Sequence, residues 1–500
     1  MRCPGFAQWQ GNVSTQAKAA RGRRPYPPGA AAPMGMGMTG RTIPSPFRIE
    51  LGATLRLAGP LAMANLLQMA VYAIDVIFVA RLGADSLAAA SLGTAVFGSV
   101  MWGFQGLISG AAPLIAAELG RGRHALREVR RTMRMGLWLS VACWLAGTLI
   151  CLGAEPFMLA TGQDPAISAR SGQFVMLLSL AIAPTVASGL LRIFVSALGR
   201  PVFAMAITGL AIVLNALGNW IFVFGKLGAP ALGLNGSAIS TILTAFATLA
   251  AYALAIRSDR RMRRYHLFGR WWRAEWRRLR QIARIGLPIA ATVIAEGGLF
   301  NGAAFLMGLI GTAQLAGHTV ALQIAAFAFQ IPFGMAQAAT IRVGFHYGAS
   351  NWAGVGHAGW AAIVSCLGFQ LASSAVMVLA PSVVISAYVD PRAAANAALV
   401  GFATQFLLVG AAFQLFDGIQ AVAAGALRGL QDTRVPMVIA LIGYWPIGFA
   451  LSWALGLHTP LGGVGVWIGL AAGLVVVACA LLLRWSRRAA FNLVPSAEQA

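Results

Sequence analysis

The sequence contains few charged residues, and acidic residues are the scarcest. Of its 500 residues, 10% are charged and only 14 are Asp or Glu, whereas 58% are hydrophobic. Because soluble domains carry roughly 25% charged residues, a water-soluble fold could not cover this much apolar surface. The apolar runs are long enough for membrane-spanning helices and too long for barrel strands, which alternate over about 10 residues. We therefore expect an all-α integral membrane protein.

The signatures of several enzyme and pump classes are also missing. The five cysteines form no CxxC pair and no Cys/His cluster, which argues against a metal centre or a disulfide framework. No phosphate-binding GxxxxGK[ST] loop occurs, so transport would depend on an ion gradient or be passive. No repeated filter loop indicates a channel. An intramembrane enzyme is a weak alternative because all six histidines lie in expected loops or near span ends. We expect no cofactor.

Twelve membrane spans are predicted from the lengths of the apolar runs and from the residues that flank them. Glycine and proline inside these runs do not argue against the spans, because membrane helices tolerate both residues. The predicted spans are residues 54–80, 89–117, 135–156, 173–195, 203–225, 236–256, 286–310, 316–344, 358–380, 398–424, 436–456 and 463–484.

Arginine supplies nearly all of the net charge of +23, and it is unevenly placed. It precedes the first span, follows spans 2, 6 and 12, and separates spans 4 and 5 and spans 10 and 11, whereas the alternate loops carry single basic residues. By the positive-inside rule, this pattern predicts a multi-pass protein of the bacterial inner membrane with both termini in the cytoplasm. Short clusters between spans do not resemble a continuous phosphate-binding face, so no nucleic-acid partner is expected.

An internal repeat divides the chain into two parts. Three pairs of residues in similar contexts are each 228 positions apart: Pro60 and Pro288, Gly83 and Gly311, and Gly120 and Gly348. Because each repeat holds six spans, both start on the same side, which predicts two six-helix lobes related by a pseudo-twofold axis along the membrane normal. The expected parts are a cytoplasmic tail (1–50), an N-lobe (51–256), a linker (257–284), a C-lobe (285–488) and a second tail (489–500).

The linker and the first tail have distinct compositions. In the linker, Trp272, Trp276 and Leu279 share one helical face and arginines cover much of the rest. This pattern favours a helix in the membrane interface that bridges the lobes over an RNA-binding segment, because both of its ends are tethered to spans. The first tail is rich in Gly, Pro, Arg and Ala without apolar periodicity, so we expect it to be disordered.

Two carboxylates stand out inside the C-lobe spans. A charged side chain at the centre of a bilayer costs about 3 kcal/mol or more, so each of them needs an explanation. Glu296 lies about 10 residues into its span, and Asp417 lies at a similar depth before Arg428. A pair of carboxylates at one depth can hold a cation, including Na⁺, or share a proton.

A third carboxylate, Asp75, lies in the first span of the N-lobe. Asn215 and Asn219 are four residues apart on one face of span 5 and can join Asp75 in a proton or cation site if the two spans pack together. One alternative is that the intramembrane acids are paired with arginines, but no arginine is expected in the middle of any span. Another alternative, protonated carboxyls that only hold helices together, stays open.

Several side chains near these acids are candidates for a substrate cavity. An aromatic wall can receive a cationic or aromatic guest by stacking and cation–π contact, although lipid-facing packing explains each aromatic residue as well. The candidates are Gln414, Phe413, Phe416, Phe300 and Trp220.

Four segments resemble the multidrug and toxic compound extrusion (MATE) family, in its NorM-type branch. They are GPLAMANLLQMAVYAIDVIFVARLG (59–83), IARIGLPIAATVIAEGGLF (282–300), AGHTVALQIAAFAFQIPFGMAQAATIRVGFHYGA (316–349) and LLVGAAFQLFDGIQAVAAGALRGLQDTRVP (407–436). The resemblance extends over residues 52–488 and includes the plan of two lobes and twelve spans.

The resemblance implies a monomeric antiporter that exports organic cations and other amphipathic drugs in exchange for Na⁺ or H⁺. It places a cation or proton site at Asp417 and Glu296, a second site at Asp75, Asn215 and Asn219, and a bendable span at Pro60. Phe413 stands where some members have a tyrosine, so one oxygen ligand for Na⁺ is missing. A lipid-precursor flippase of the same superfamily is the alternative, and it would need a cavity lined with arginines.

Overall fold

The computed structural model describes residues 45–122, 124–269 and 273–495. These residues are 85% helical and contain no β-strand. The helices of the N-lobe are α2 (Pro46–Ala80), α3 (Ala84–Ser109), α4 (Ala111–Arg121), α5 (Ala125–Leu152), α6 (Ala154–Ala160), α7 (Pro165–Ser179), α8 (Ile182–Ala197), α9 (Pro201–Phe224), α10 (Leu234–Ser258) and the short η1 (Arg263–Tyr265). Those of the C-lobe are α11 (Trp276–Ile310), α12 (Thr312–Gly348), α13 (Trp352–Leu379), α14 (Pro381–Ile385), η2 (Ala394–Asn396), α15 (Ala397–Gly429), α16 (Arg434–Ile442), the π-helix η3 (Gly443–Phe449), α17 (Ala450–Leu457) and α18 (Gly463–Ser486).

The twelve expected spans are present, and one of them is broken. Eleven helical stretches are long and apolar enough to cross a membrane, and the bent pair α7–α8 provides the twelfth. The sequence predicted a continuous span over 173–195, whereas α7 and α8 meet at an angle of 47°. Pro184 explains the break, because it lacks an N–H and its ring clashes with the carbonyl of Leu180 in a continuous helix.

Two predicted boundaries differ from the structure. Helix α2 begins at Pro46, so residues 46–50 are helical and do not belong to a disordered tail. Helix α11 begins at Trp276 and continues to Ile310, so Trp276 and Leu279 lie in the first turns of a spanning helix rather than in a separate interfacial helix. Trp272 lies outside the described residues, as do residues 1–44 of the predicted tail.

Each lobe has its own hydrophobic core, and the first helix of each lobe also enters the core of the other. Leu57 and Leu61 of α2 pack in the cluster formed mainly by α12, α13, α15 and α18 of the C-lobe. Ile285 and Ile289 of α11 pack in the cluster formed mainly by α4, α5 and α8 of the N-lobe. The lobes are therefore joined by two helices that cross between their cores.

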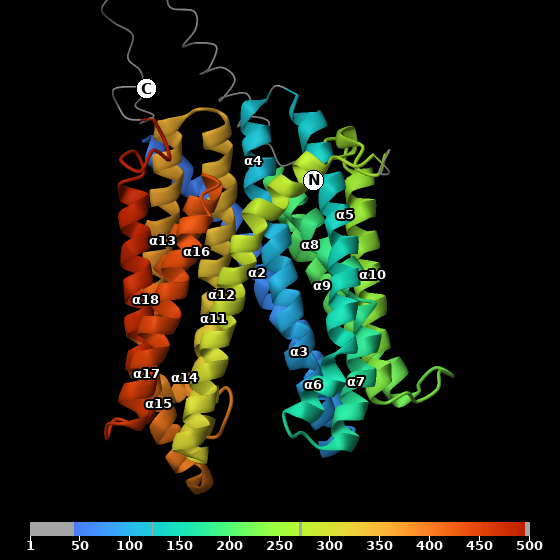
Figure 1. The fold of residues 1–500 in the computed structure, drawn as a ribbon, viewed down its shortest axis with the longest axis vertical. Helices are drawn as coiled ribbons and strands as arrows, with labels where there is room; N and C mark the ends of the chain where they lie inside the picture. The colour runs from blue at the N-terminus through green and yellow to red at the C-terminus, as the bar shows by residue number, and fades with distance from the viewer. Residues whose placement is uncertain (1–44, 123, 270–272, 496–500) are drawn as a thin grey trace, which may run out of the picture. The chain divides into compact units, whose positions relative to one another are not determined.

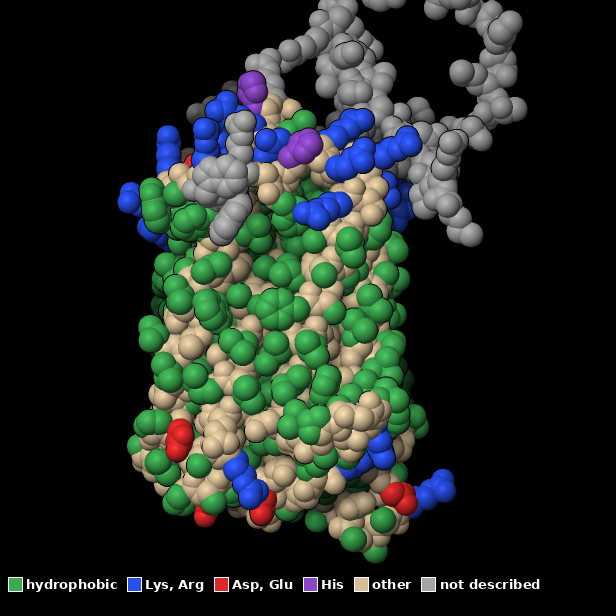
Figure 2. Space-filling model, turned by 90° about the vertical axis from the view of Figure 1, so that its right-hand side faces the viewer, with side chains coloured by type: hydrophobic (Ala, Val, Ile, Leu, Met, Phe, Trp, Pro, Cys, Tyr) green, Lys and Arg blue, Asp and Glu red, His purple; other side chains and the backbone are tan. Residues whose placement is uncertain are grey.

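The two ends of the described helical bundle differ. Lys and Arg side chains gather at one end, here named the basic end, and a hydrophobic band covers the middle (Figure 2). Helices α3 and α11 lie side by side toward the basic end and diverge toward the opposite end (Figure 1). Contacts between the lobes are close enough to exclude a side chain, since a β-carbon on Gly120 would lie 1.9 Å from the carbonyl oxygen of Phe345. The structure is closed at the basic end.

Candidate ion and proton sites

Asp75 is the centre of a polar cluster in the N-lobe. It projects from α2 toward α9, where Asn215 and Asn219 lie one turn apart on the same helical face. Asn219 Nδ2 donates to Asp75 Oδ1 at 2.7 Å, and Asn215 Nδ2 donates to the same oxygen at 3.0 Å. Both asparagines are fully buried. The structure thus brings together the three residues that the sequence proposed for this site.

Helix α10 completes the N-lobe cluster with two hydroxyl groups. Ser240 Oγ donates to the backbone carbonyl of Asn215 at 2.9 Å, and the Thr241 side chain forms a hydrogen bond with Asp75. The sequence analysis missed both residues. A serine or threonine inside a membrane helix commonly bonds the carbonyl four residues earlier, so its presence alone does not indicate a site.

Gln420 is the centre of the C-lobe cluster. Its amide Nε2 donates to Asp417 Oδ1 at 3.0 Å and to Glu296 Oε1 at 3.2 Å. Asp417 and Gln420 lie three residues apart on one face of α15, and Glu296 reaches them from α11. The expected pair of carboxylates therefore exists, and a single amide bridges it.

Tyr444 fixes the orientation of that amide. Its hydroxyl donates to Gln420 Oε1 at 2.9 Å, so the amide nitrogen faces the two carboxylates. Tyr444 is 2% exposed and belongs to the π-helix η3, a rare element that is frequent at functional sites. The sequence offered no signal for this residue, because its contact joins two different helices and depends on tertiary packing.

Two arginines, Arg192 and Arg428, lie in membrane-spanning helices. Arg428, near the end of α15, interacts electrostatically with Glu296. Arg192 lies within α8, and its Nη1 donates to Asn65 Oδ1 of α2 at 3.3 Å. Among the described residues, no ion pair joins an arginine to Asp75, Glu296 or Asp417, so Arg428 acts on Glu296 only at longer range. The expectation that these carboxylates have no arginine partner therefore stays a prediction.

The proposed cavity residues occupy different environments. Phe413 and Gln414 are each 1% exposed, and the Phe413 ring packs edge-on against Phe300 and Trp467 at centroid distances of 6.1 and 5.5 Å. Phe416 packs against the C-lobe core, whereas Trp220 is 41% exposed. In this conformation Phe413 and Gln414 present almost no surface to a guest. Their role in a cavity stays a prediction.

Two further expectations concern the hinge and the metal. Pro60 lies inside the continuous helix α2 and removes one backbone hydrogen bond there, so its role as a hinge stays a prediction. Within the described part of the chain, no three His, Cys, Asp or Glu side chains are grouped as a metal site. Na⁺ at Glu296 and Asp417 would therefore need further oxygen ligands from amides, hydroxyls, backbone or water.

Comparison with known proteins gives a consistent result. The MatE family model matches residues 60–221 and 288–454, and these two segments begin at the repeat-related Pro60 and Pro288. The chain is 45% identical over 442 residues to a probable multidrug resistance protein NorM of Mesorhizobium japonicum, covering 88% of this chain and 95% of that protein. It is 42% identical over 443 residues to the protein of the same description in Brucella suis, covering 88% and 94%.

Solved structures share the fold at lower identity. One is a MATE-family multidrug resistance transporter in an outward-facing conformation, with a TM-score of 0.79 and 22% identity over 89% of this chain and 96% of that chain. Another is the eukaryotic MATE transporter AtDTX14, with a TM-score of 0.77 and 19% identity over 90% and 100%. These similarities confirm the predicted architecture of twelve helices in two lobes.

Proposed function

We propose that this chain, which belongs to the MATE family of transporters, is a secondary antiporter that exports organic cations and other amphipathic drugs in exchange for H⁺ or Na⁺. The NorM relatives are described as multidrug resistance proteins, and we extend that activity to this chain. The lobes would alternate in exposing a central site to the two sides of the membrane. Like its family, the protein is a membrane transporter and not an enzyme.

The observation that carries the proposal is the pair of carboxylates that share one amide in the C-lobe. Asp417 and Glu296 each accept a hydrogen bond from Gln420 Nε2, and Asp417 is 6% exposed. Two negative charges this close in a low-dielectric interior repel each other strongly, and they are relieved when a proton or another cation binds. Antiport follows if the coupling ion and a cationic drug compete for this negative charge.

The closed basic end gives the proposed cycle a direction. If the basic end faces the cytoplasm, as the positive-inside rule predicts, this conformation is closed toward the cytoplasm. A drug would be released from it to the opposite side, and the coupling ion would enter from there. The ion drives the cycle only if its affinity differs between the two facing states.

Of the two coupling ions, the geometry favours the proton. Gln420 presents an N–H group to both carboxylates, whereas Na⁺ binds to oxygen atoms. Phe413 provides no oxygen one turn before Asp417. A proton needs no further ligand, since one carboxyl can hold it and so removes the repulsion between the two charges.

The lipid-precursor flippase receives less support. A flippase for a pyrophosphate lipid would need arginines free to line an anion cavity. Arg428 instead interacts with Glu296, and Arg192 donates to Asn65. Both arginines are already engaged with groups of the protein.

The proposal is tested by ethidium transport in reconstituted vesicles. Ethidium should move against its gradient when a pH gradient alone is imposed, and a Na⁺ gradient alone at equal pH should drive less transport. If neither gradient drives ethidium or another organic cation, the antiporter assignment is wrong. Transport driven by Na⁺ alone would keep the antiporter and overturn the preference for the proton.

A further inference from the structure

The segment of α2 before Pro60, here named the first arm, is attached to the C-lobe by a buried ion pair. Glu50 Oε1 and Oε2 lie 2.5 and 2.6 Å from Arg342 Nη2 of α12, and Arg342 Nε donates to Oε2 at 3.1 Å. His346 Nε2 lies 2.9 Å from Glu50 Oε1. All three residues are less than 9% exposed, so this contact is shielded from water and salt.

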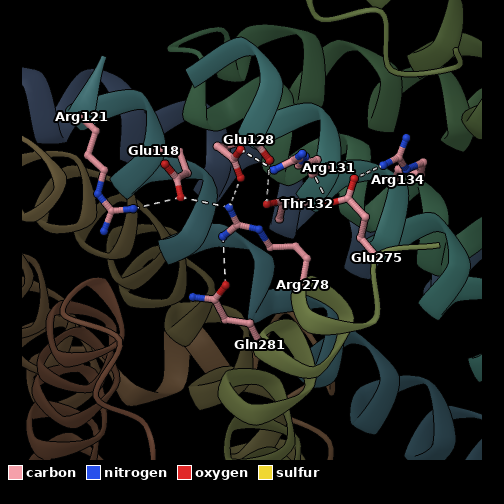
Figure 3. Close-up of polar contacts among 9 residues, drawn as sticks. All are labelled: Glu118, Arg121, Glu128, Arg131, Thr132, Arg134, Glu275, Arg278 and Gln281. Carbon is pink, nitrogen blue, oxygen red and sulfur yellow. Dashed lines mark hydrogen bonds and ion pairs between the residues drawn. The ribbon is translucent and has the colours of Figure 1, made fainter. Parts of the chain in front are cut away.

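The segment of α11 before Pro288, here named the second arm, is attached to the N-lobe in the same way. Arg278 Nη2 lies 3.2 Å from Glu118 Oε1 of α4 and forms an ion pair with Glu128 of α5 (Figure 3). Just before the arm, Glu275 forms ion pairs with two arginines of α5, Arg131 and Arg134 (Figure 3). The start of α11 is therefore held on the opposite lobe.

The two attachments occupy equivalent positions of the internal repeat. Glu50 and Arg278 are 228 residues apart, and so are Glu118 and His346. This is the separation of Pro60 and Pro288, which end the two arms. The contact of Glu50 with His346 thus corresponds to the contact of Arg278 with Glu118, and the arm carries the opposite charge in each copy.

The apolar contacts around the attachments follow the same symmetry. A β-carbon on Gly106 would lie 2.7 Å from Ala290 Cα, and one on Gly334 would lie 2.7 Å from the backbone nitrogen of Ala62. Gly106 and Gly334 are 228 residues apart, as are Ala62 and Ala290. The closed interface is therefore built twice, once by each copy of the repeat.

The two attachments are not identical. They differ in their charged residues and in how deeply these residues are buried. Arg342 of the first attachment corresponds to the uncharged Leu114 in the second copy. In the second attachment, the additional ion pair is formed with Glu128 of α5 instead. The Glu50 and Arg342 side chains are 10% and 8% exposed, whereas Arg278 and Glu128 are 14% and 22% exposed. The first attachment is the more deeply buried of the two.

We infer that the two arms form a paired electrostatic latch, in which Glu50 with Arg342 and His346, and Arg278 with Glu118 and Glu128, hold the lobes together at the basic end. Among the described residues, the ion pairs that join α2 to α12 and α11 to α4 and α5 all lie at this end. Opening of the basic end requires both attachments to separate. The inference rests on the proposed alternation of the lobes.

The latch sets the balance between the two facing states. Separation of the lobes leaves Glu50 and Arg342 without their partners, and an uncompensated buried charge is strongly unfavourable until water reaches it. Removing one charge weakens only the closed state and therefore favours the open one. Transport needs both states, so a latch that is too weak slows the cycle as much as one that is too strong.

The test measures the distance between the lobes directly. Spin labels are placed in a cysteine-free background at two exposed positions of the basic end, Leu126→Cys in the N-lobe and Ser486→Cys in the C-lobe. Glu50→Gln should increase the population with a longer distance by at least about tenfold, because a buried pair has lost one partner. Exchanging the charges with Glu50→Arg and Arg342→Glu together should restore the shorter distance.

A matched control distinguishes the latch from a general loss of charge. Asp432 pairs with Arg484 within the C-lobe, and these side chains are 10% and 14% exposed. Asp432→Asn removes a similar ion pair that does not join the lobes, so the distance distribution should not change. If Glu50→Gln leaves the distribution as it is in the parent protein, or if Asp432→Asn changes it equally, the latch is overturned.

Two further measurements keep the result interpretable. If Glu50→Gln does not accumulate in the membrane, Arg278→Gln tests the other attachment, and an unchanged distance in that variant also overturns the inference. The distances are measured without substrate or gradient. A shifted distance in Glu50→Gln, together with a parent protein that does not transport ethidium, would support the latch and contradict the antiporter. Ethidium transport by the parent protein, together with an unchanged distance in Glu50→Gln, would support the antiporter and overturn the latch.

Discussion

The polar clusters of the two lobes combine the same groups in opposite proportions. In the N-lobe, one carboxylate, Asp75, accepts hydrogen bonds from two amides, Asn215 and Asn219. In the C-lobe, two carboxylates accept hydrogen bonds from one amide, that of Gln420. The two lobes therefore hold clusters that differ in charge and in the number of donors.

This difference assigns different tasks to the two clusters. The amides of the N-lobe can stabilise Asp75 as an anion, since hydrogen bonds to the charged form favour it. The single amide of the C-lobe cannot do the same for two anions that repel each other. We expect the C-lobe cluster to bind the coupling ion. We expect the N-lobe cluster to change the rate of efflux.

The largest expected effect follows from Asp417→Asn, which removes one of the two C-lobe carboxylates without changing the volume of the side chain. The remaining Glu296 would no longer experience the repulsion that a cation relieves. We expect ethidium efflux driven by a pH gradient to fall by about 100-fold, near the upper limit of typical coupling energies. Initial rates in vesicles, normalised to the amount of protein, provide the measurement.

Asp432→Asn is again the matched control, because Asp432 belongs to the same lobe but pairs with Arg484 away from the cluster. It should retain efflux within about twofold, because distant sites with no shared partners usually act independently. Efflux by Asp417→Asn at the rate of the parent protein would show that the two-carboxylate site does not couple the ion.

The next effect concerns the amides of the N-lobe. Asn219 donates to Asp75 at 2.7 Å and also to Asn215 Oδ1 at 3.2 Å, whereas Asn215 donates at 3.0 Å. Asn219→Ala should therefore slow efflux by about tenfold, since a hydrogen bond to a charged group contributes about 1.5–3 kcal/mol. Asn215→Ala should slow it less. The same vesicle assay ranks the variants, and equal rates for both would contradict the order given by the geometry.

A smaller effect is expected from Tyr444→Phe, which keeps the ring and removes the donor to Gln420 Oε1. The amide would then be free to turn its oxygen toward the carboxylates. Efflux should fall by about fivefold, corresponding to roughly 1 kcal/mol for one hydrogen bond, and Na⁺ should begin to support transport. Tyr252→Phe is the control, because Tyr252 is a buried tyrosine of the N-lobe that contacts Thr208. Equal losses in both variants would refute a specific role for Tyr444.

The sequence was sufficient for the architecture and for the charged members of both sites. Long apolar runs reveal spanning helices, and a carboxylate within such a run is conspicuous because it costs free energy to bury. Asp75, Glu296 and Asp417 were therefore found directly. Asn215 and Asn219 were found because a spacing of four residues places them on one helical face.

Contacts that depend on tertiary packing could not be predicted in this way. Glu50 seemed to belong to a tail, and its partner Arg342 lies 292 residues further along the chain. Tyr444 is one polar group in the apolar segment GYWPIGF, and its partner Gln420 lies on another helix, 24 residues earlier in the chain. The break between α7 and α8 was missed because membrane helices often accommodate a proline, and Pro184 alone does not reveal a 47° bend.

The smallest effect, and the sharpest test of the coupling ion, is expected from Phe413→Tyr. Phe413 lies one turn before Asp417 on α15, and its ring packs between Phe300 and Trp467. A hydroxyl added to this ring would supply an oxygen from the residue one turn before Asp417, and we expect it to serve as a ligand for Na⁺. We expect efflux driven by a pH gradient to change by less than about threefold, the cost of a small overpacking.

Na⁺ dependence provides the decisive measurement for this variant. Na⁺ should stimulate ethidium efflux in Phe413→Tyr and not in the parent protein, because the cluster would then offer three oxygen-bearing side chains around one position. Combining Phe413→Tyr with Tyr444→Phe should strengthen the response, since the amide oxygen of Gln420 could then join them. If Na⁺ stimulates the double variant but not Phe413→Tyr alone, the N–H group of Gln420 between the carboxylates is what excludes Na⁺. If Na⁺ has no effect on either variant, neither the missing hydroxyl nor this N–H group determines the coupling ion.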